Sequence, residues 1–248
     1  MNELQTKADE LIKKIETGEC DAKCAEDAFG AFAKYFLGCV VFKSKENGVY
    51  RPVEIEMYYH SKNHPDPYVH KNEGQLKNKG FYWHEAGVDV VLGKKNNNNP
   101  VFFGVLISGI IVDTDKEDYC YKKIEIHEKI RNCVCDIKLD ENSNQKCYRA
   151  TRVNLNYNVL DTQENPYIAR LYRFANVLPA NQGMYNKTKF SFYYWLDCIK
   201  NSFKDCKEKP QGIERTKTEI KAYHEMYRIG QDAIERLIEL GFDNLKKN

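Results

Sequence analysis

The chain has no apolar run long enough to cross a bilayer, which argues against a membrane-spanning protein or a membrane partner. Its N-terminus is polar and acidic and has no signal-peptide pattern, so we expect a cytoplasmic protein. The nine cysteines are scattered, and the pairs Cys20/Cys24 and Cys133/Cys135 lack zinc-ribbon spacing. We therefore expect reduced thiols, and a structural zinc or a set of disulfides is the less favoured alternative.

Charge of one sign is also scarce, because 38 basic side chains nearly balance 36 acidic ones and leave a net charge of +2. Proteins that bind nucleic acid strongly often have a clearer basic excess. Basic residues do gather between Lys200 and Lys221, but acids interrupt them, so a solvated helix surface is the simpler interpretation. With 248 residues, 42% of them hydrophobic, the chain can form one good core with a helical appendage.

The first hundred residues show clear periodicity. Segments 3–16 and 22–37 have the apolar spacing of amphipathic helices, and Asp21 is a candidate N-cap for the second. An apolar segment, an Asn47-Gly48 turn and an alternating segment then predict a β-hairpin, in which Pro52 indicates an edge or a bulge. The segment 60–80 is a long polar loop, of a length that is often functional.

The other expected elements are short strands at 81–83 and 88–92, a central strand at 101–112, a helix within 116–130, a strand near 153–159, and helices at 167–174, 190–203 and 215–240. We see no internal repeat. The pattern predicts a single α+β domain at 1–190, with N-terminal helices at 3–37 and a sheet core at 38–160. A C-terminal helical extension, 191–248, is expected to pack on it.

The strongest functional signal is the strand Val53-Glu54-Ile55-Glu56-Met57-Tyr58. Polar and apolar residues alternate strictly, so Glu54, Glu56 and Tyr58 share one face. A strand that places two carboxylates side by side either faces solvent or lines a site. Four of the six histidines follow between residues 60 and 84, together with aromatic and acidic residues. We therefore place candidate chemistry on this strand and the loop after it.

The order of these segments resembles the alkyladenine (3-methyladenine, methylpurine-type) DNA glycosylases. The resemblance covers residues 30 to 112 only, and we align nothing beyond with that family. Its matching segments are Phe36-Leu37-Gly38, Val53-Glu54-Ile55-Glu56-Met57-Tyr58, His70, Asn78-Lys79-Gly80-Phe81-Tyr82, Ala86-Gly87, Val88–Gly93 and Val105-Leu106-Ile107.

The resemblance implies a domain built around a curved, mostly antiparallel sheet and a hydrolase for DNA repair by base excision. Damaged duplex DNA would be the partner, and neither a cofactor nor a metal would be needed. Glu56 would be the catalytic base that deprotonates water for attack at the sugar C1′. His70 and Tyr58 would hold the flipped base. We expect a monomer.

The sequence departs from the family pattern at three positions. Asp89 stands where the family has a stacking Tyr, and Leu92 stands where it has a base-displacing Tyr, although a Leu still serves as an apolar wedge. Ser108 replaces an Arg, and Asn99 is a candidate for the family's pocket Asn. Asp89 adds a third carboxylate near Glu56, so the substrate base is expected to differ or catalysis to be lost.

Two other functions stay open at this stage. A non-catalytic relative that binds a nucleic acid or nucleotide is the first, and Asp89, Ser108 and the near-neutral charge favour it. A metal-dependent hydrolase is the second, with His60, His64, His70 and Asp66 as candidate ligands. Their spacing on a loop matches no known zinc pattern, so we expect no metal there.

Overall fold

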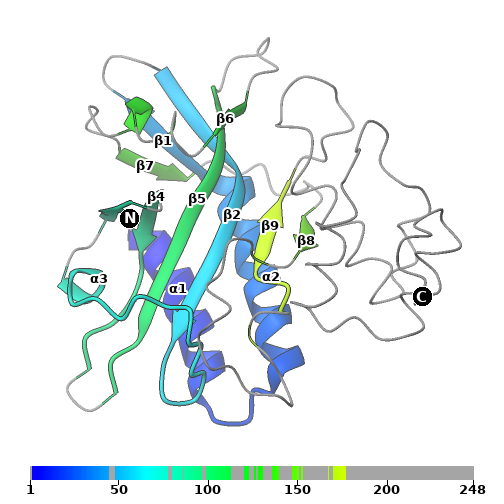
Figure 1. Ribbon diagram of the computed structural model, residues 1–248. Helices are drawn as coiled ribbons and strands as arrows, with labels where there is room; N and C mark the ends of the chain where they lie inside the picture. The colour runs from blue at the N-terminus through cyan, green and yellow to red at the C-terminus, as the bar shows by residue number, and fades with distance from the viewer. Residues whose placement is uncertain are drawn as a thin grey trace, which may run out of the picture.

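The computed structural model has two helices lying along one face of an antiparallel sheet (Figure 1). It describes residues 2–44, 48–77, 80–85, 87–96, 99–112, 120–122, 126, 128–130, 136–139, 147–150, 152, 167 and 170–176. The α+β class and the antiparallel sheet predicted from the sequence are confirmed. Among the helices of this described part, none combines the length and the apolar character needed to cross a bilayer.

The first two helices form as their periodicity predicts. Helix α1 (Asn2–Glu16) buries its apolar stripe, and α2 (Ala22–Cys39) buries ten residues. Asp21 is the N-cap of α2, and its carboxylate accepts a hydrogen bond of 2.8 Å from the backbone N–H of Cys24. This bond satisfies one of the N–H groups that the first turn leaves without a helical partner.

The turn between the helices corrects one prediction. Cys20 and Cys24 form a disulfide, with their Cα atoms 5.2 Å apart, where we expected reduced thiols. Cys20 directly precedes the N-cap Asp21 and Cys24 lies in the first turn of α2, so the helix start holds their Cα atoms at a separation that allows a disulfide. A spacing of four residues does not by itself predict this arrangement.

The hairpin is also present. Strand β1 (Val40–Ser44) pairs with β2 (Gly48–His60), and Gly48 has a positive φ of 92° at the turn. Strand β2 then runs beside β5 (Phe102–Val112), with a register shift after Pro52 that confirms the expected bulge. The other edge of β2 pairs with β1 before Pro52 and with β9 (Arg173–Ala175) after it.

The sheet has the order β3-β4-β5-β2-β1-β7, with β6 beside β5, β9 beside β2 and β8 beside β9, and all its pairs are antiparallel. A short helix, α3, lies in the loop that follows β2. The remaining elements are α3 (Gly74–Lys77), β3 (Gly80–His84), β4 (Gly87–Val91), β6 (Cys120–Lys122), β7 (Asp136–Leu139) and β8 (Tyr148–Ala150). The long strands β2 and β5 form the centre.

The predictions after residue 112 have mixed outcomes. The expected helix at 167–174 is wrong in its described C-terminal part, because 170–172 are irregular and lead into β9. The helix expected within 116–130 is confirmed in part, since residues 126 and 128–130 are helical and β6 precedes them. Three-residue strands are too short to show alternation. The predicted strand near 153–159, the helices at 190–203 and 215–240, and the extension 191–248 lie outside the described residues.

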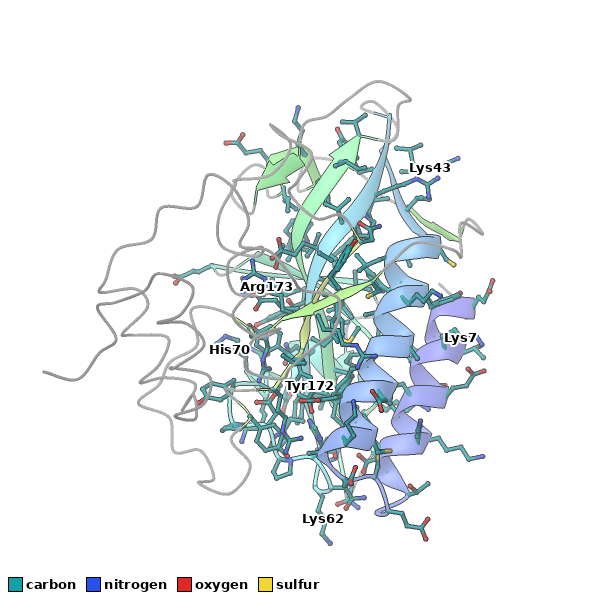
Figure 2. All side chains as sticks on the ribbon, turned by 90° about the vertical axis from the view of Figure 1, so that its right-hand side faces the viewer. Lys7, Lys43, Lys62, His70, Tyr172 and Arg173 are labelled. Atoms are coloured by element: carbon teal, nitrogen blue, oxygen red, sulfur yellow. A yellow bond between two sulfur atoms is a disulfide. The ribbon has the colours of Figure 1, made fainter. Side chains whose placement is uncertain are left out.

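The two faces of the sheet differ in character. On one face Ile55, Met57 and Tyr59 pack with the helices, and Phe29 of α2 contacts the rings of Tyr59 and Phe103. The alternate residues of β2 point to the opposite face. Figure 2 shows His70 and Arg173 on the side of the sheet away from the two helices. We call this the open face because α1 and α2 do not cover it. It carries the carboxylates of the predicted site, which are nevertheless buried.

Candidate functional site

The strand register places three of the predicted polar residues on the open face. Glu56 on β2 and Asp89 on β4 are both paired with Leu106 of β5, the strand that lies between them. Directly paired residues of antiparallel strands project to the same face. Tyr58, two residues after Glu56, is on that face too. Glu56, Tyr58 and Asp89 are therefore brought to one surface.

Glu56 is buried, with 4% of its surface exposed, and has two polar neighbours. The hydroxyl of Tyr58 donates a hydrogen bond of 2.7 Å to its Oε2, and Nε of Arg173 lies 3.7 Å from its Oε1. Burial, the Glu56 charge and the Asp89 charge raise the pKa of Tyr58 well above its usual value, so the hydroxyl stays a donor. These contacts fix the orientation of the Glu56 carboxylate.

Glu54 belongs to the same cluster. Its carboxylate pairs with the guanidinium of Arg173, which comes from β9, the strand beside β2. Burial raises the pKa of Glu54, and the neighbouring Glu56 raises it further, while Arg173 opposes both effects. One arginine is thus shared between two carboxylates, and the cluster has an excess of negative charge.

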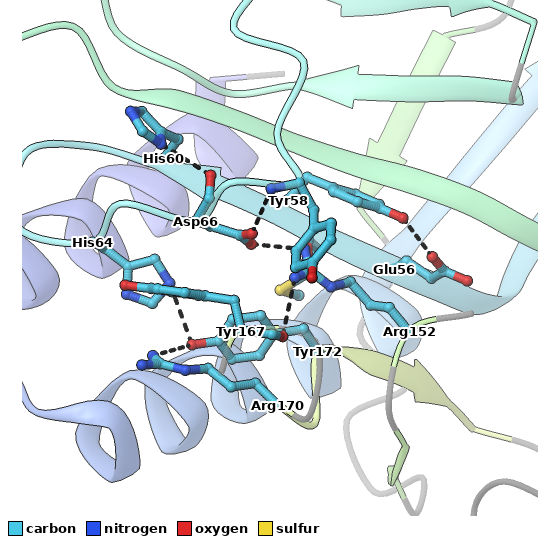
Figure 3. Close-up of polar contacts among 11 residues, drawn as sticks. Glu56, Tyr58, His60, His64, Asp66, Arg152, Tyr167, Arg170 and Tyr172 are labelled. Atoms are coloured by element: carbon cyan, nitrogen blue, oxygen red, sulfur yellow. Dashed lines mark hydrogen bonds and ion pairs between the residues drawn. The ribbon is translucent and has the colours of Figure 1, made fainter. Parts of the chain in front are cut away.

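A second buried cation lies beside Tyr58. The guanidinium of Arg152 is 4.8 Å from the centre of the Tyr58 ring and donates a hydrogen bond of 2.7 Å to Oδ2 of Asp66 (Figure 3). It also donates to the carbonyl oxygens of Met57 and Tyr167. Arg152 therefore occupies one side of the Tyr58 ring, and a base cannot stack on that side.

Asp89 forms the other end of the open face. It is 3% exposed, and its Oδ2 accepts a long hydrogen bond of 3.4 Å from Nε2 of Gln75 in α3. Nε2 of His84 lies 3.2 Å from its Oδ1. The ring of Tyr82 stacks on that of His84 with centroids 5.6 Å apart. The position where the glycosylase family that the sequence resembles has an aromatic side chain is thus polar here, with aromatic rings next to it.

The remaining predicted residues lie elsewhere. His70 is exposed, and its ring centroid is 6.0 Å from that of His84, so it belongs to the Asp89 end. Leu92 is 1% exposed and packs in the core on the helix side, which does not fit a DNA wedge. Asn99 is an exposed residue in the connection between β4 and β5. We therefore leave Leu92 and Asn99 out of the site.

The histidines of the long loop have different surroundings. Nδ1 of His60 lies 3.0 Å from the carbonyl oxygen of Asp66, and His64 packs against Phe29 and Tyr172. Burial lowers the pKa of His64 to about 3. Within the described ranges, no group of three His, Cys, Asp or Glu side chains is arranged to hold a metal ion.

Sequence reasoning missed Arg152, Arg173, Gln75 and His84 as members of the site. The two arginines follow the region of family resemblance, in segments without clear periodicity. Gln75 lies in a polar loop where its single amide carries no signal. The sequence indicated His84 only as one of the four histidines between residues 60 and 84, next to the predicted strand at 81–83. These four residues are recognised as members of the site only through their contacts with the carboxylates of Glu54, Asp66 and Asp89 in the structure.

No known protein family model matches this chain. A search of curated proteins finds an uncharacterized protein of Acanthamoeba polyphaga mimivirus that is 33% identical over an alignment of 81 residues. This alignment covers 25% of the present chain and 38% of the viral protein. The chain therefore matches well under half of that relative's length, and the relative's name states no activity.

Proposed function

We propose that this protein hydrolyses the N-glycosidic bond of a damaged purine in DNA, as the methylpurine-type glycosylases that it resembles do. Glu56 is the catalytic base, and Tyr58 and the Asp89 end hold the base. The observation that carries the proposal is the single surface shared by Glu56, Tyr58 and Asp89. We propose the cytoplasm as its location and a monomer as its working state.

The proposed reaction needs one carboxylate and one water molecule. Glu56 takes a proton from the water, whose oxygen attacks C1′ of the sugar while the bond from C1′ to the base nitrogen breaks. The electron pair of that bond leaves with the base, so a base that carries a positive charge from alkylation departs as a neutral molecule. The proton that Glu56 accepted from the water then passes to solvent. The contacts of Tyr58 and Arg173 with Glu56 support this role, because a general base must keep a fixed position relative to the water.

The charge of the open face supports a cationic or electron-poor substrate. Glu54, Glu56 and Asp89 contribute three carboxylates to this face, and Arg173 bonds to the first and lies near the second. Such a surface stabilises the positive charge that develops on the sugar and attracts an alkylated base. It also repels phosphate, so the DNA backbone is expected to run beside the face and not across it.

Release of a modified base from alkylated duplex DNA tests the proposal. The wild-type protein should release the base, and Glu56→Gln should lose activity by at least about a hundredfold, a typical contribution of a general base. Gln keeps an oxygen for the Tyr58 hydroxyl, so the fold should survive. Glu10→Gln is the matched control, because Glu10 is an exposed carboxylate of α1. A wild-type protein that releases no base from any damaged duplex contradicts the proposal.

A non-catalytic nucleic-acid or nucleotide-binding protein is the second candidate. The partial occupation of the Tyr58 ring by Arg152 and the acid at Asp89 favour it. In that case the protein binds its ligand without turnover, and Glu56→Gln leaves the affinity unchanged. Parallel measurements of binding and base release on the same two proteins separate the candidates.

A further inference from the structure

The Asp89 end of the open face contains buried acceptors that the protein itself does not satisfy. Gln75 and Asp89 are only 2% and 3% exposed. Among the described residues, Oε1 of Gln75 and Oδ1 of Asp89 have no hydrogen-bond partner. Nε2 of His84 is close to Oδ1, at 3.2 Å, but is not aligned as a hydrogen-bond donor. A buried polar atom without a partner is costly, so a ligand or a water molecule is expected there.

Two glycines allow this arrangement. A Cβ on Gly93 would lie 3.2 Å from the carbonyl oxygen of Gln75 and even closer to that of Val101, so only glycine lets α3 approach the sheet here. A Cβ on Gly104 would lie 3.1 Å from Oδ2 of Asp89. The amide of Gln75 donates to the same Oδ2. The hydrogen bond between Gln75 and Asp89 therefore leaves Oδ1 of Asp89 and Oε1 of Gln75 as two acceptors without partners.

Aromatic rings adjoin these acceptors. Tyr82 is directly paired with Asp89 across β3 and β4, and its ring stacks on His84 with an angle of 25° between the planes. The exposed His70 lies next to His84. Rings of this kind bind planar groups through their faces. A planar ligand is therefore favoured over a flexible one.

We propose that Asp89 and Gln75 bind the edge of a planar nitrogen heterocycle that presents two adjacent N–H donors, the edge found in guanine. The two acceptor oxygens of this bonded pair complement two donors, and a carbonyl or ring nitrogen at either position would face an acceptor and be rejected. The inference rests on the proposed function for the kind of ligand, a nucleobase, but the binding it describes does not require hydrolysis.

The spacing of the strands agrees with this orientation. Asp89 and Glu56 are separated by β5, so their backbones are two strand spacings, or about 10 Å, apart. The apolar Leu106 lies between them in the same register. A base whose donor edge meets Asp89 would lie over Leu106 and direct its glycosidic bond toward Glu56. Asp89 and Gln75 would thus bind one edge of the base, and Glu56 would lie near the glycosidic bond at its other end.

Guanosine and inosine provide the test, because inosine lacks only the 2-amino group of guanosine. In calorimetric titrations the wild-type protein should bind guanosine at least about tenfold more tightly than inosine, a value typical of a hydrogen bond to a charged acceptor. Asp89→Asn replaces one acceptor by a donor and should abolish this preference. Gln75→Met, which removes the second acceptor, should reduce it and provides a second test if Asp89→Asn fails to fold.

Glu56→Gln is the control that separates this inference from the proposed reaction. It should keep the preference for guanosine, because its side chain is two strands away from Asp89. A protein that prefers guanosine but releases no base supports the inference and contradicts the hydrolase. Equal or absent binding of the two nucleosides overturns the inference whatever the base-release assay gives, and it means that the acceptors hold water only.

Discussion

Among the ion pairs of the described residues, the Arg152–Asp66 pair is the most completely buried. Both side chains are fully buried, and the guanidinium also lies over the rings of Tyr58, Tyr68 and Tyr172. Such a pair need not stabilise the fold relative to apolar residues, but removal of one partner leaves a charge in a medium that solvates it poorly. The pair is therefore sensitive to substitution.

Asp66→Asn should lower the free energy of unfolding by about 3–5 kcal/mol, the usual cost of an uncompensated buried charge. Asp27→Asn, the same chemical change at a half-exposed position, should cost less than about 1 kcal/mol. Urea unfolding of both variants provides the comparison. Equal effects of the two substitutions would show that the buried pair has no special role.

His64 predicts a pH dependence of stability. Burial lowers its folded-state pKa to about 3, while the unfolded chain has a pKa near its ordinary value of 6.5. Below pH 6.5 the unfolded state therefore binds a proton that the folded state does not, and stability falls as the pH decreases toward 3. The contribution of this one group has a slope of about 1 kcal/mol per pH unit in that range.

Unfolding of the wild type and His64→Phe at several pH values isolates this contribution. The variant loses the contact of His64 with the Tyr172 hydroxyl, so its stability at neutral pH changes. The slope between pH 6 and 4 should nevertheless be smaller than that of the wild type by about 1 kcal/mol per pH unit. Parallel curves would assign the acid sensitivity to other groups.

At the scale of elements, glycines decide how closely segments approach. Gly93 faces backbone atoms of Val101 and Phe103 that cannot move independently, so Gly93→Ala should destabilise the protein by about 1–3 kcal/mol. Gly30 in α2 faces only the guanidinium of Arg149, the end of a flexible side chain. Gly30→Ala should be neutral or stabilising, because alanine favours the helix. Thermal unfolding of both variants checks the contrast.

The Cys20–Cys24 disulfide fixes the turn before α2. It closes a loop of five residues, for which the loss of chain entropy corresponds to about 2 kcal/mol of stability. Reduction of the wild type should lower its stability by this amount, while Cys20→Ser should be insensitive to reductant. If reductant affects both proteins equally, this disulfide is not the source of the change.

At the scale of the whole molecule, the sheet separates two environments. The face toward α1 and α2 is a core of aliphatic and aromatic side chains, and the open face contains the acids and their arginines. With a net charge of +2, the protein has little overall attraction for a polyanion. Any binding to DNA is therefore expected to depend on few phosphate contacts.

Measurements of DNA affinity against salt concentration test this expectation. About two or three phosphate contacts predict a slope of roughly −2 to −3 for log K against log salt concentration. Fluorescence anisotropy with a short duplex provides the data. A slope steeper than about −6 would reveal a basic surface that net charge does not indicate.

The local elements of the first 112 residues follow from the sequence, because their signals are local. The helix stripes, the Asp21 cap, the Asn-Gly turn and the alternation of β2 each involve residues within one or two turns of one another. The later strands were missed because they are short and exist through pairing with β1, β2 and β5. Their stability comes from partners distant in the chain.

The sequence by itself determined that Glu54, Glu56 and Tyr58 share a face, since this depends only on the alternation of a strand. Only the tertiary structure decided that Asp89 lies two strands from Glu56, that Leu92 belongs to the core and that Arg173 pairs with Glu54. These relations depend on strand order and register. Both are set by the packing of the whole sheet on its helices, which no local pattern encodes.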